Sequence, residues 1–113
     1  MPLSQNEKIA NRGYKVYRAL LTQTGTSAPV VTEQENDLGP VVWAYGSTGT
    51  YTATLASAFA GTTSARITNG NIAGIVGAVK TNANVVTVLS GTAAATAANA
   101  ILTNAAIEIR VEL

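Results

Sequence analysis

The sequence contains no histidine and no cysteine among its 113 residues. Their absence excludes thiolate nucleophiles, imidazole bases, disulfide bonds and zinc sites of the usual kind. Charged residues are also scarce, at 12% of the chain, and the net charge is +1. Because phosphate-backbone binding depends on an excess of basic residues, we expect no nucleic-acid partner.

Long apolar runs and targeting features are missing too. No apolar stretch approaches the ~20 residues of a membrane helix, so we expect no membrane partner. The polar start, residues 1–8, lacks the apolar region of a secretory signal, which predicts that the mature chain begins near residue 1. The length predicts a single domain, and 47% apolar residues argue against a disordered chain.

The few charges are unevenly distributed along the chain. They crowd the first third and the end, and between Leu38 and Ile107 only Arg66 and Lys80 are charged. This middle part is rich in Thr, Ala, Gly, Asn and Ser. Since soluble monomers usually carry roughly 25–35% charged residues on their surface, two interpretations remain open. The domain is either a soluble sandwich coated with threonine or a subunit whose neutral face packs on its neighbours.

Short segments with alternating apolar and polar residues, separated by turn residues, predict β-strands. They cover residues 14–23, 30–35, 41–45, 50–55, 64–68, 72–80, 84–90 and 107–113. We therefore predict an all-β fold, a single-domain β-sandwich or jelly-roll-like barrel of about eight short strands. Residues 14–113 form this domain, and residues 1–13 form an N-terminal arm.

Two of these segments carry more detailed predictions, and two others are ambiguous. Residues 41–45 and 50–55 predict a hairpin with a four-residue loop, and Phe59 beyond it is predicted to lie in the core. Segment 72–80 is interpreted as a strand or an irregular segment, because Gly74 and Gly77 weaken both propensities. The alanine-rich stretch 91–100 predicts a short helix or a mobile loop. In the last segment, Glu108, Arg110 and Glu112 share one face and are interpreted as a charged outer edge.

Ionisable residues give little support for catalysis. Glu33, Glu35 and Asp37 form the one carboxylate cluster, and on a strand they would share a face that could bind a hard cation such as calcium. The simpler interpretation, which we favour, is a solvated acidic loop. The glycine-rich run 70–77 lacks the spacing of a nucleotide-binding loop. The sequence therefore predicts a protein that is not an enzyme, with no metal and no other cofactor.

Aromatic and basic residues indicate contact surfaces instead. Trp43, Tyr45 and Tyr51 could form a platform for sugar, but we favour core or subunit-interface positions for Trp43 and Tyr51. Arg12, Lys15 and Arg18 lie near acidic residues, which favours a solvated or inter-subunit salt-bridging face. The predicted interface residues are Arg12, Tyr14, Tyr17, Trp43 and Tyr45.

The sequence also resembles a group of short proteins encoded among the virion genes of phages and prophages of the Bacteroidota. The resemblance rests on Tyr17-Arg-Ala-Leu-Leu-Thr-Gln-Thr-Gly-Thr-Ser-Ala-Pro29, on Glu35-Asn-Asp-Leu-Gly39 with Val41-Val-Trp43, on Gly49-Thr-Tyr-Thr-Ala-Thr-Leu55, and on Leu102-Thr-Asn-Ala-Ala-Ile-Glu-Ile-Arg-Val111. The part from Ile72 to Ala98 departs from that pattern. The resemblance implies a structural role in the virion and brings no catalytic signature.

These observations lead to two functional hypotheses. The first is a non-enzymatic phage virion structural protein: a capsid decoration, head-fibre or tail-associated subunit that assembles as a homo-oligomer or with other capsid or tail proteins. The second is a carbohydrate-binding or adhesin module that uses an aromatic face around Trp43, with a host glycan as its partner. The sequence leaves open the position in the particle, the copy number and the identity of the partners.

Overall fold

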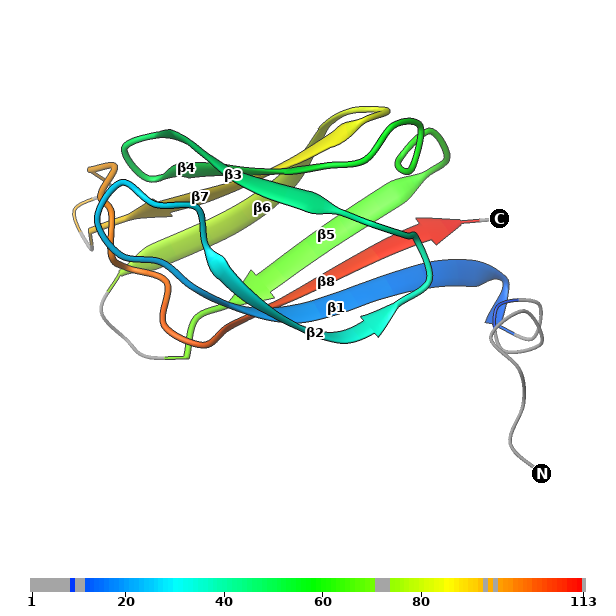
Figure 1. The fold of residues 1–113 in the computed structure, drawn as a ribbon, viewed down its shortest axis with the longest axis horizontal. Helices are drawn as coiled ribbons and strands as arrows, with labels where there is room; N and C mark the ends of the chain where they lie inside the picture. Colours follow the sequence, from blue (N-terminus) through cyan, green and yellow to red (C-terminus); the bar gives the residue numbers. More distant parts are fainter. Residues whose placement is uncertain (1–8, 10–11, 71–73, 93, 95, 113) are drawn as a thin grey trace.

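The computed structural model describes residue 9 and residues 12–70, 74–92, 94 and 96–112. It contains eight strands in two four-stranded antiparallel sheets, which face each other as the two layers of a β-sandwich (Figure 1). Sheet A has the order β2-β1-β8-β5, and sheet B has the order β3-β4-β7-β6. The strands are β1 (Tyr14–Thr22), β2 (Val30–Asn36), β3 (Val42–Ser47), β4 (Thr50–Thr54), β5 (Thr63–Thr68), β6 (Ile75–Asn82), β7 (Val85–Gly91) and β8 (Ala105–Glu112).

The predicted all-β sandwich is therefore confirmed. Its core forms because inward-facing side chains alternate with outward-facing ones along each strand. Sheet A contributes the inner residues of β1 and β8, and sheet B contributes those of β4 and β7. The apolar residues of these four strands that are no more than 1% exposed are Tyr17, Ala19, Leu21, Tyr51, Ala53, Val86, Val88, Ala105, Ile107 and Ile109.

Connections between the two sheets close the ends of the core. Phe59, in the crossover from β4 to β5, is fully buried as predicted, and its N–H donates to the carbonyl of Ala83 at 2.9 Å. In the crossover from β2 to β3, the side-chain oxygen of Asn36 accepts the N–H groups of Leu38 and Gly39 at 2.8 and 3.0 Å. This side-chain turn reverses the chain where the sequence predicted a turn.

The predicted hairpin between β3 and β4 is present with a shorter loop. Only Thr48 and Gly49 separate the two strands, and the register shifts between Tyr45 and Ser47. The extra residue at this bulge is Gly46, so the four-residue loop is wrong because strand pairing continues past the glycine. Bulges of this kind increase the local twist of an edge strand.

Segment 91–100 is not a helix in its described residues. Gly91 and Ala97 form an isolated antiparallel bridge, the N–H of Thr92 donates to Thr96 O, and the N–H of Ala98 donates to Ser90 O. The alanine-rich segment therefore folds back on the end of β7, and these tertiary contacts override its helical propensity. The ambiguous segment 72–80 becomes β6 from Ile75 onward, and residues 71–73 lie outside the described residues.

The final strand occupies a different place from the one its charges suggested. β8 is hydrogen-bonded to β1 on one side and to β5 on the other, so it is an interior strand of sheet A. The interpretation of its charged residues as a protective edge is therefore wrong. Their side chains cover the outer face of the sheet. The N-terminal arm, residues 1–13, lies largely outside the described residues.

Candidate functional site

The outer face of sheet A carries a row of alternating charges that crosses all four strands. The strand registers place Glu35 opposite Arg18, Arg18 opposite Glu108, and Glu108 opposite Arg66. Arg18 and Glu35 form an ion pair at 3.4 Å, and Glu108 accepts a bond from the Nε of Arg110 at 2.7 Å. We call these four cross-strand residues the charge row. Opposite charges on neighbouring strands attract one another, so the row favours this register.

The acidic residues that were candidates for a cation site lie beside arginine. One guanidinium nitrogen of Arg12 bonds to Asp37, and the other bonds to Glu35 at 3.2 Å. Asp37 also accepts the backbone N–H of Val16 at 3.0 Å. The interpretation as a solvated acidic loop is therefore wrong, because Glu35 lies in β2 and both carboxylates are ion-paired within the chain. In the described part of the chain, no group of acidic side chains has an arrangement that could hold a metal ion.

Tyr14, one of the predicted interface residues, lies between two arginines. The guanidinium carbon of Arg12 is 5.3 Å from the centre of the Tyr14 ring, and that of Arg110 is 4.8 Å from it. Cations over an aromatic face at these distances are attracted by the ring. Arg12 and Arg18, near the start of the domain, thus make contacts within their own chain. The prediction of an inter-subunit role for Arg12 and Tyr14 stays a prediction.

The other predicted interface residues point into the sandwich. Tyr17 has no exposed surface, and its hydroxyl accepts the indole N–H of Trp43 at 3.1 Å. Trp43 and Tyr45, on the inner side of β3, are half-buried and pack against the core. The ring centres of Tyr45 and Tyr51 lie 6.0 Å apart, and Tyr51 is fully buried. These rings therefore close one margin of the core and do not stand together as an exposed platform.

Burial changes the acidity of two of these tyrosines. Burial raises the pKa of Tyr17 well above its ordinary value, the Trp43 hydrogen bond opposes the rise, and the neighbouring Glu33 adds to it. Burial also raises the pKa of Tyr51, and its hydrogen bond with Ser90 partly opposes this effect. Both phenols therefore stay neutral at physiological pH and serve as hydrogen-bonding groups inside the fold.

The outer face of sheet B differs in charge from the outer face of sheet A. Its outward side chains come from alternate positions of β3, β4, β7 and β6, and none is charged. We call this set the neutral face: Val42, Ala44, Thr50, Thr52, Thr54, Val85, Thr87, Leu89, Ile75, Gly77 and Val79. The one charged residue in the four strands, Lys80, points to the margin of the sheet, where it donates to Gly61 O at 3.0 Å.

Large apolar side chains are concentrated on the neutral face. Five such side chains are markedly exposed in the described chain, and four of them belong to this face. These are Val42 at 63%, Ile75 at 51%, Val79 at 53% and Leu89 at 48% exposure. Single exposed apolar residues are ordinary, whereas a contiguous uncharged patch is typical of a contact surface. Sequence reasoning had predicted a neutral surface as one alternative, but it had not identified these residues.

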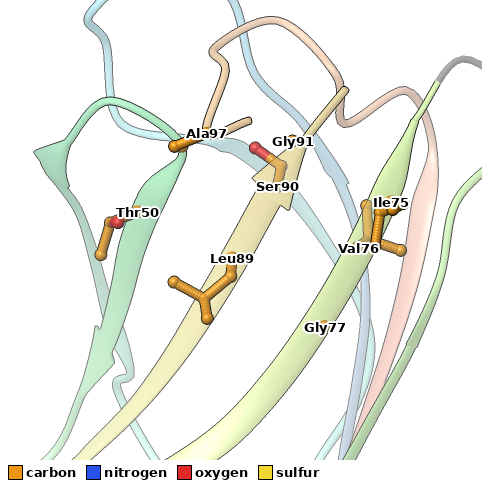
Figure 2. Close-up of a pocket in the computed structure, with 9 residues that line it drawn as sticks. Thr50, Ile75, Val76, Gly77, Leu89, Ser90, Gly91 and Ala97 are labelled. Carbon is orange, nitrogen blue, oxygen red and sulfur yellow. The ribbon is translucent and has the colours of Figure 1, made fainter. Parts of the chain in front are cut away.

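A hollow of about 330 Å³ lies at one end of the neutral face. Figure 2 shows Leu89 of β7 between Thr50 of β4 and Gly77 of β6, with Ala97 near the end of the hollow. A side chain added at Gly77 would meet no atom within 4 Å, so the sheet is open there. The walls offer methyl groups and few polar atoms. This composition suits an aliphatic side chain better than a charged ligand.

Comparisons with known proteins do not assign this fold to a family. No protein-family model, no curated protein and no solved structure matches the chain. Among the described residues, no helix has the length and apolar character needed to cross a membrane. The two outer faces of the sandwich are therefore the candidate functional surfaces.

Proposed function

We propose that this protein is a non-enzymatic structural subunit of a phage virion, a capsid decoration, head-fibre or tail-associated protein that acts through protein–protein assembly. The observation that carries the proposal is the neutral face: a whole sheet face without a charged side chain and with four exposed aliphatic residues. Burying the exposed part of each would contribute about 1 kcal/mol to association. The sequence resemblance to small phage virion proteins supports the same role.

The distribution of polar groups also supports assembly over catalysis. Six of the ionisable side chains in the described chain, on sheet A and beside it, are bound in intrachain ion pairs: Arg12, Arg18, Glu35, Asp37, Glu108 and Arg110. A general acid or base needs a positioned group within reach of a substrate cavity. The hollow on the neutral face is lined by no ionisable residue. A surface of this kind binds another surface and supplies no group for proton transfer.

Particle composition tests the proposal directly. Phage particles from a culture that carries the gene would be purified on a density gradient, and an antibody against this chain would be used for immunogold labelling. We expect labelling on the particles and the intact chain in their mass spectrum. Gradient-purified particles that lack the chain, while the free protein accumulates in the lysate, would contradict a virion role.

The alternative, a glycan-binding module around Trp43, has less support from the geometry. The indole N–H is donated to Tyr17 within the chain, and the half-buried ring packs against the core, so only part of the ring is displayed to a sugar. A glycan array compares the wild type with Trp43→Ala. Specific binding that the substitution abolishes while the fold is retained would favour the glycan-binding function over assembly.

A further inference from the structure

We propose that the neutral face is the contact between two copies of this chain, packed face to face about a twofold axis. This inference rests on the proposed assembly function and names both the surface and its partner. The neutral face would lie against the same face of the second copy, with the charged outer face of sheet A directed away. The result is a closed dimer of two stacked sandwiches.

The distribution of charge favours packing of neutral face on neutral face over packing of the neutral face on sheet A. If the neutral face of one copy lay on sheet A of the next, it would bury the charge row of Glu35, Arg18, Glu108 and Arg66 against apolar groups. Burying charges without new partners is costly. A neutral face on a neutral face buries no ionised group. Because the same patch is then used by both copies, the interface closes on itself and does not extend into a filament.

The chemistry of the face complements itself. Across its middle, Thr52 is paired with Ala44 on one side and Thr87 on the other, and Thr87 is paired with Val79. Thr87 shares a hydroxyl–hydroxyl hydrogen bond with Thr81 within the chain. A threonine hydroxyl is both donor and acceptor, so it can still bond to a threonine of the second copy. The surrounding valines, leucine and isoleucine provide apolar contact. Sheet faces of this composition pack about 10 Å apart in sandwiches, and a second copy presents such a face.

The size of the face predicts a reversible dimer. Four strands spaced ~4.8 Å apart and about six residues long at ~3.3 Å per residue give a face of roughly 400 Å² in projection. Two copies would bury roughly 800 Å², and somewhat more over the corrugated side chains. This area is below the usual range of stable interfaces and is typical of weak, reversible contacts. The hollow beside Leu89 and Gly77 gives an aliphatic side chain of the second copy a place to insert. We expect dissociation in the micromolar range.

Sedimentation of the full chain over a wide concentration range tests this inference. We expect the average mass to rise from the 11.5 kDa of one chain towards twice that value between about 1 μM and 1 mM. A mass that stays at one chain throughout this range overturns the proposal. So does growth past a dimer into larger species, because the twofold contact is closed.

Substitutions then identify the face. Thr52 lies on an interior strand of sheet B and points outward, and Ala106 occupies the matching position on an interior strand of sheet A. Thr52→Lys is expected to raise the dissociation constant at least tenfold, because it buries a charge in the neutral face. The control Ala106→Lys is expected to leave it unchanged. Equal weakening by both substitutions, or weakening by Ala106→Lys alone, contradicts the assignment to the neutral face.

Further variants guard against misfolding and test the symmetry. If Thr52→Lys does not keep the β-type circular dichroism spectrum, Val79→Lys replaces it, since Val79 is 53% exposed and tolerates a charge in the monomer. Mixing the Thr52→Lys and Thr52→Glu proteins is expected to restore association, because a central residue of a twofold interface lies near its own copy. Failure of the mixture to associate contradicts the twofold arrangement.

The dimer and the virion role can be rejected independently of each other. A strictly monomeric chain that is nevertheless found on purified particles would reject the second copy as occupant and retain the virion role. A dimer that is absent from particles would support the face-to-face contact and reject the virion role.

Discussion

The hydroxyl of Tyr51 donates a hydrogen bond to the side-chain oxygen of Gln23 at 2.8 Å, and both residues are buried. The same oxygen accepts the backbone N–H of Ala100 at 2.8 Å. The amide nitrogen of Gln23 donates to the backbone carbonyls of Thr24, Gly25 and Ser27. One glutamine thus joins the turn after β1, the loop before β8 and an inner strand of sheet B at one end of the sandwich.

We predict that Gln23→Leu lowers the free energy of unfolding by about 2–4 kcal/mol. The substitution removes the acceptor of the buried Tyr51 hydroxyl and of the Ala100 N–H, and it removes the donor to three carbonyls of the turn after β1. Urea titration monitored by the fluorescence of Trp43, the one tryptophan in the sequence, measures the change. The control Gln34→Leu lies on the exposed part of β2 and should shift stability by less than about 0.5 kcal/mol. Equal losses in the two variants would contradict the role of Gln23.

Two glycines predict opposite responses to the same substitution. At Gly49, φ is +68° and an added Cβ would lie 2.3 Å from Ser90 O and 2.8 Å from Ala98 N, which are backbone atoms. Gly49→Ala should therefore cost about 2–4 kcal/mol in unfolding free energy. Gly77 has open space, so Gly77→Ala should be neutral or stabilise the strand by up to about 1 kcal/mol. Thermal unfolding in dilute solution compares them, and similar midpoints for the two variants would refute the contact at Gly49.

The stability of the fold should decrease at alkaline pH. The pKa values of Tyr17 and Tyr51 are raised above 10.0 in the folded chain, chiefly by burial. Below pH 10 both phenols are protonated in the folded and unfolded states, so their contribution is fully present. Above it the unfolded chain releases protons that the folded chain retains, and the free energy of unfolding falls as pH rises, by up to about 1.4 kcal/mol per pH unit for each tyrosine.

Urea unfolding at a series of pH values between about 9 and 11.5 measures this slope. The control Tyr17→Phe removes one of the two groups and should make the decline shallower, although it also removes the acceptor of the Trp43 N–H. A free energy of unfolding that remains level across this range would show that neither phenol is protected.

The charge row predicts a destabilisation that salt relieves. Glu108 lies between Arg18 and Arg66 in the strand register and bonds to Arg110. Glu108→Lys places like charges on neighbouring strands and should cost about 1–2 kcal/mol at low ionic strength. Because the site is partly exposed, about 0.5 M salt should recover much of the loss. The control Glu112→Lys is opposite Tyr14 and should have a smaller effect. A loss that does not change with salt would point to packing and not to charge.

Local sequence patterns predicted most strands because alternation is a property of neighbouring residues. The runs at Tyr51 and Ala53, and at Ile107 and Ile109, bury the residues that the pattern assigned to the core. The alanine-rich segment shows the limit of this reasoning. Its residues favour a helix by themselves, but the bridge between Gly91 and Ala97 and the bond from Ala98 N to Ser90 O place it against β7. Helical propensity describes a residue within its own segment and takes no account of hydrogen bonds to another strand.

The candidate surface needed information that no single segment contains. Val42, Leu89, Ile75 and Val79 belong to three strands, and each strand by itself shows only one or two exposed aliphatic residues. Strand order brings them onto one face. The same applies to the charge row, since Glu35 and Glu108 are far apart in sequence and meet through Arg18. The predicted charged edge failed for this reason, because alternation shows which residues share a face but not which strands flank it.

By itself, the sequence determined the all-β class, the scarcity of reactive groups and the inward side of the clearest strands. These follow from composition and from the two-residue period of a strand, which are local. The tertiary structure decided that the ion-paired charges gather on sheet A and that the outer face of sheet B is left neutral. This division of charge between the two sheets is set by pairing between strands that are distant in the chain. The pairing uses backbone hydrogen bonds, which every residue type can form, so the local sequence does not reveal which strands are neighbours.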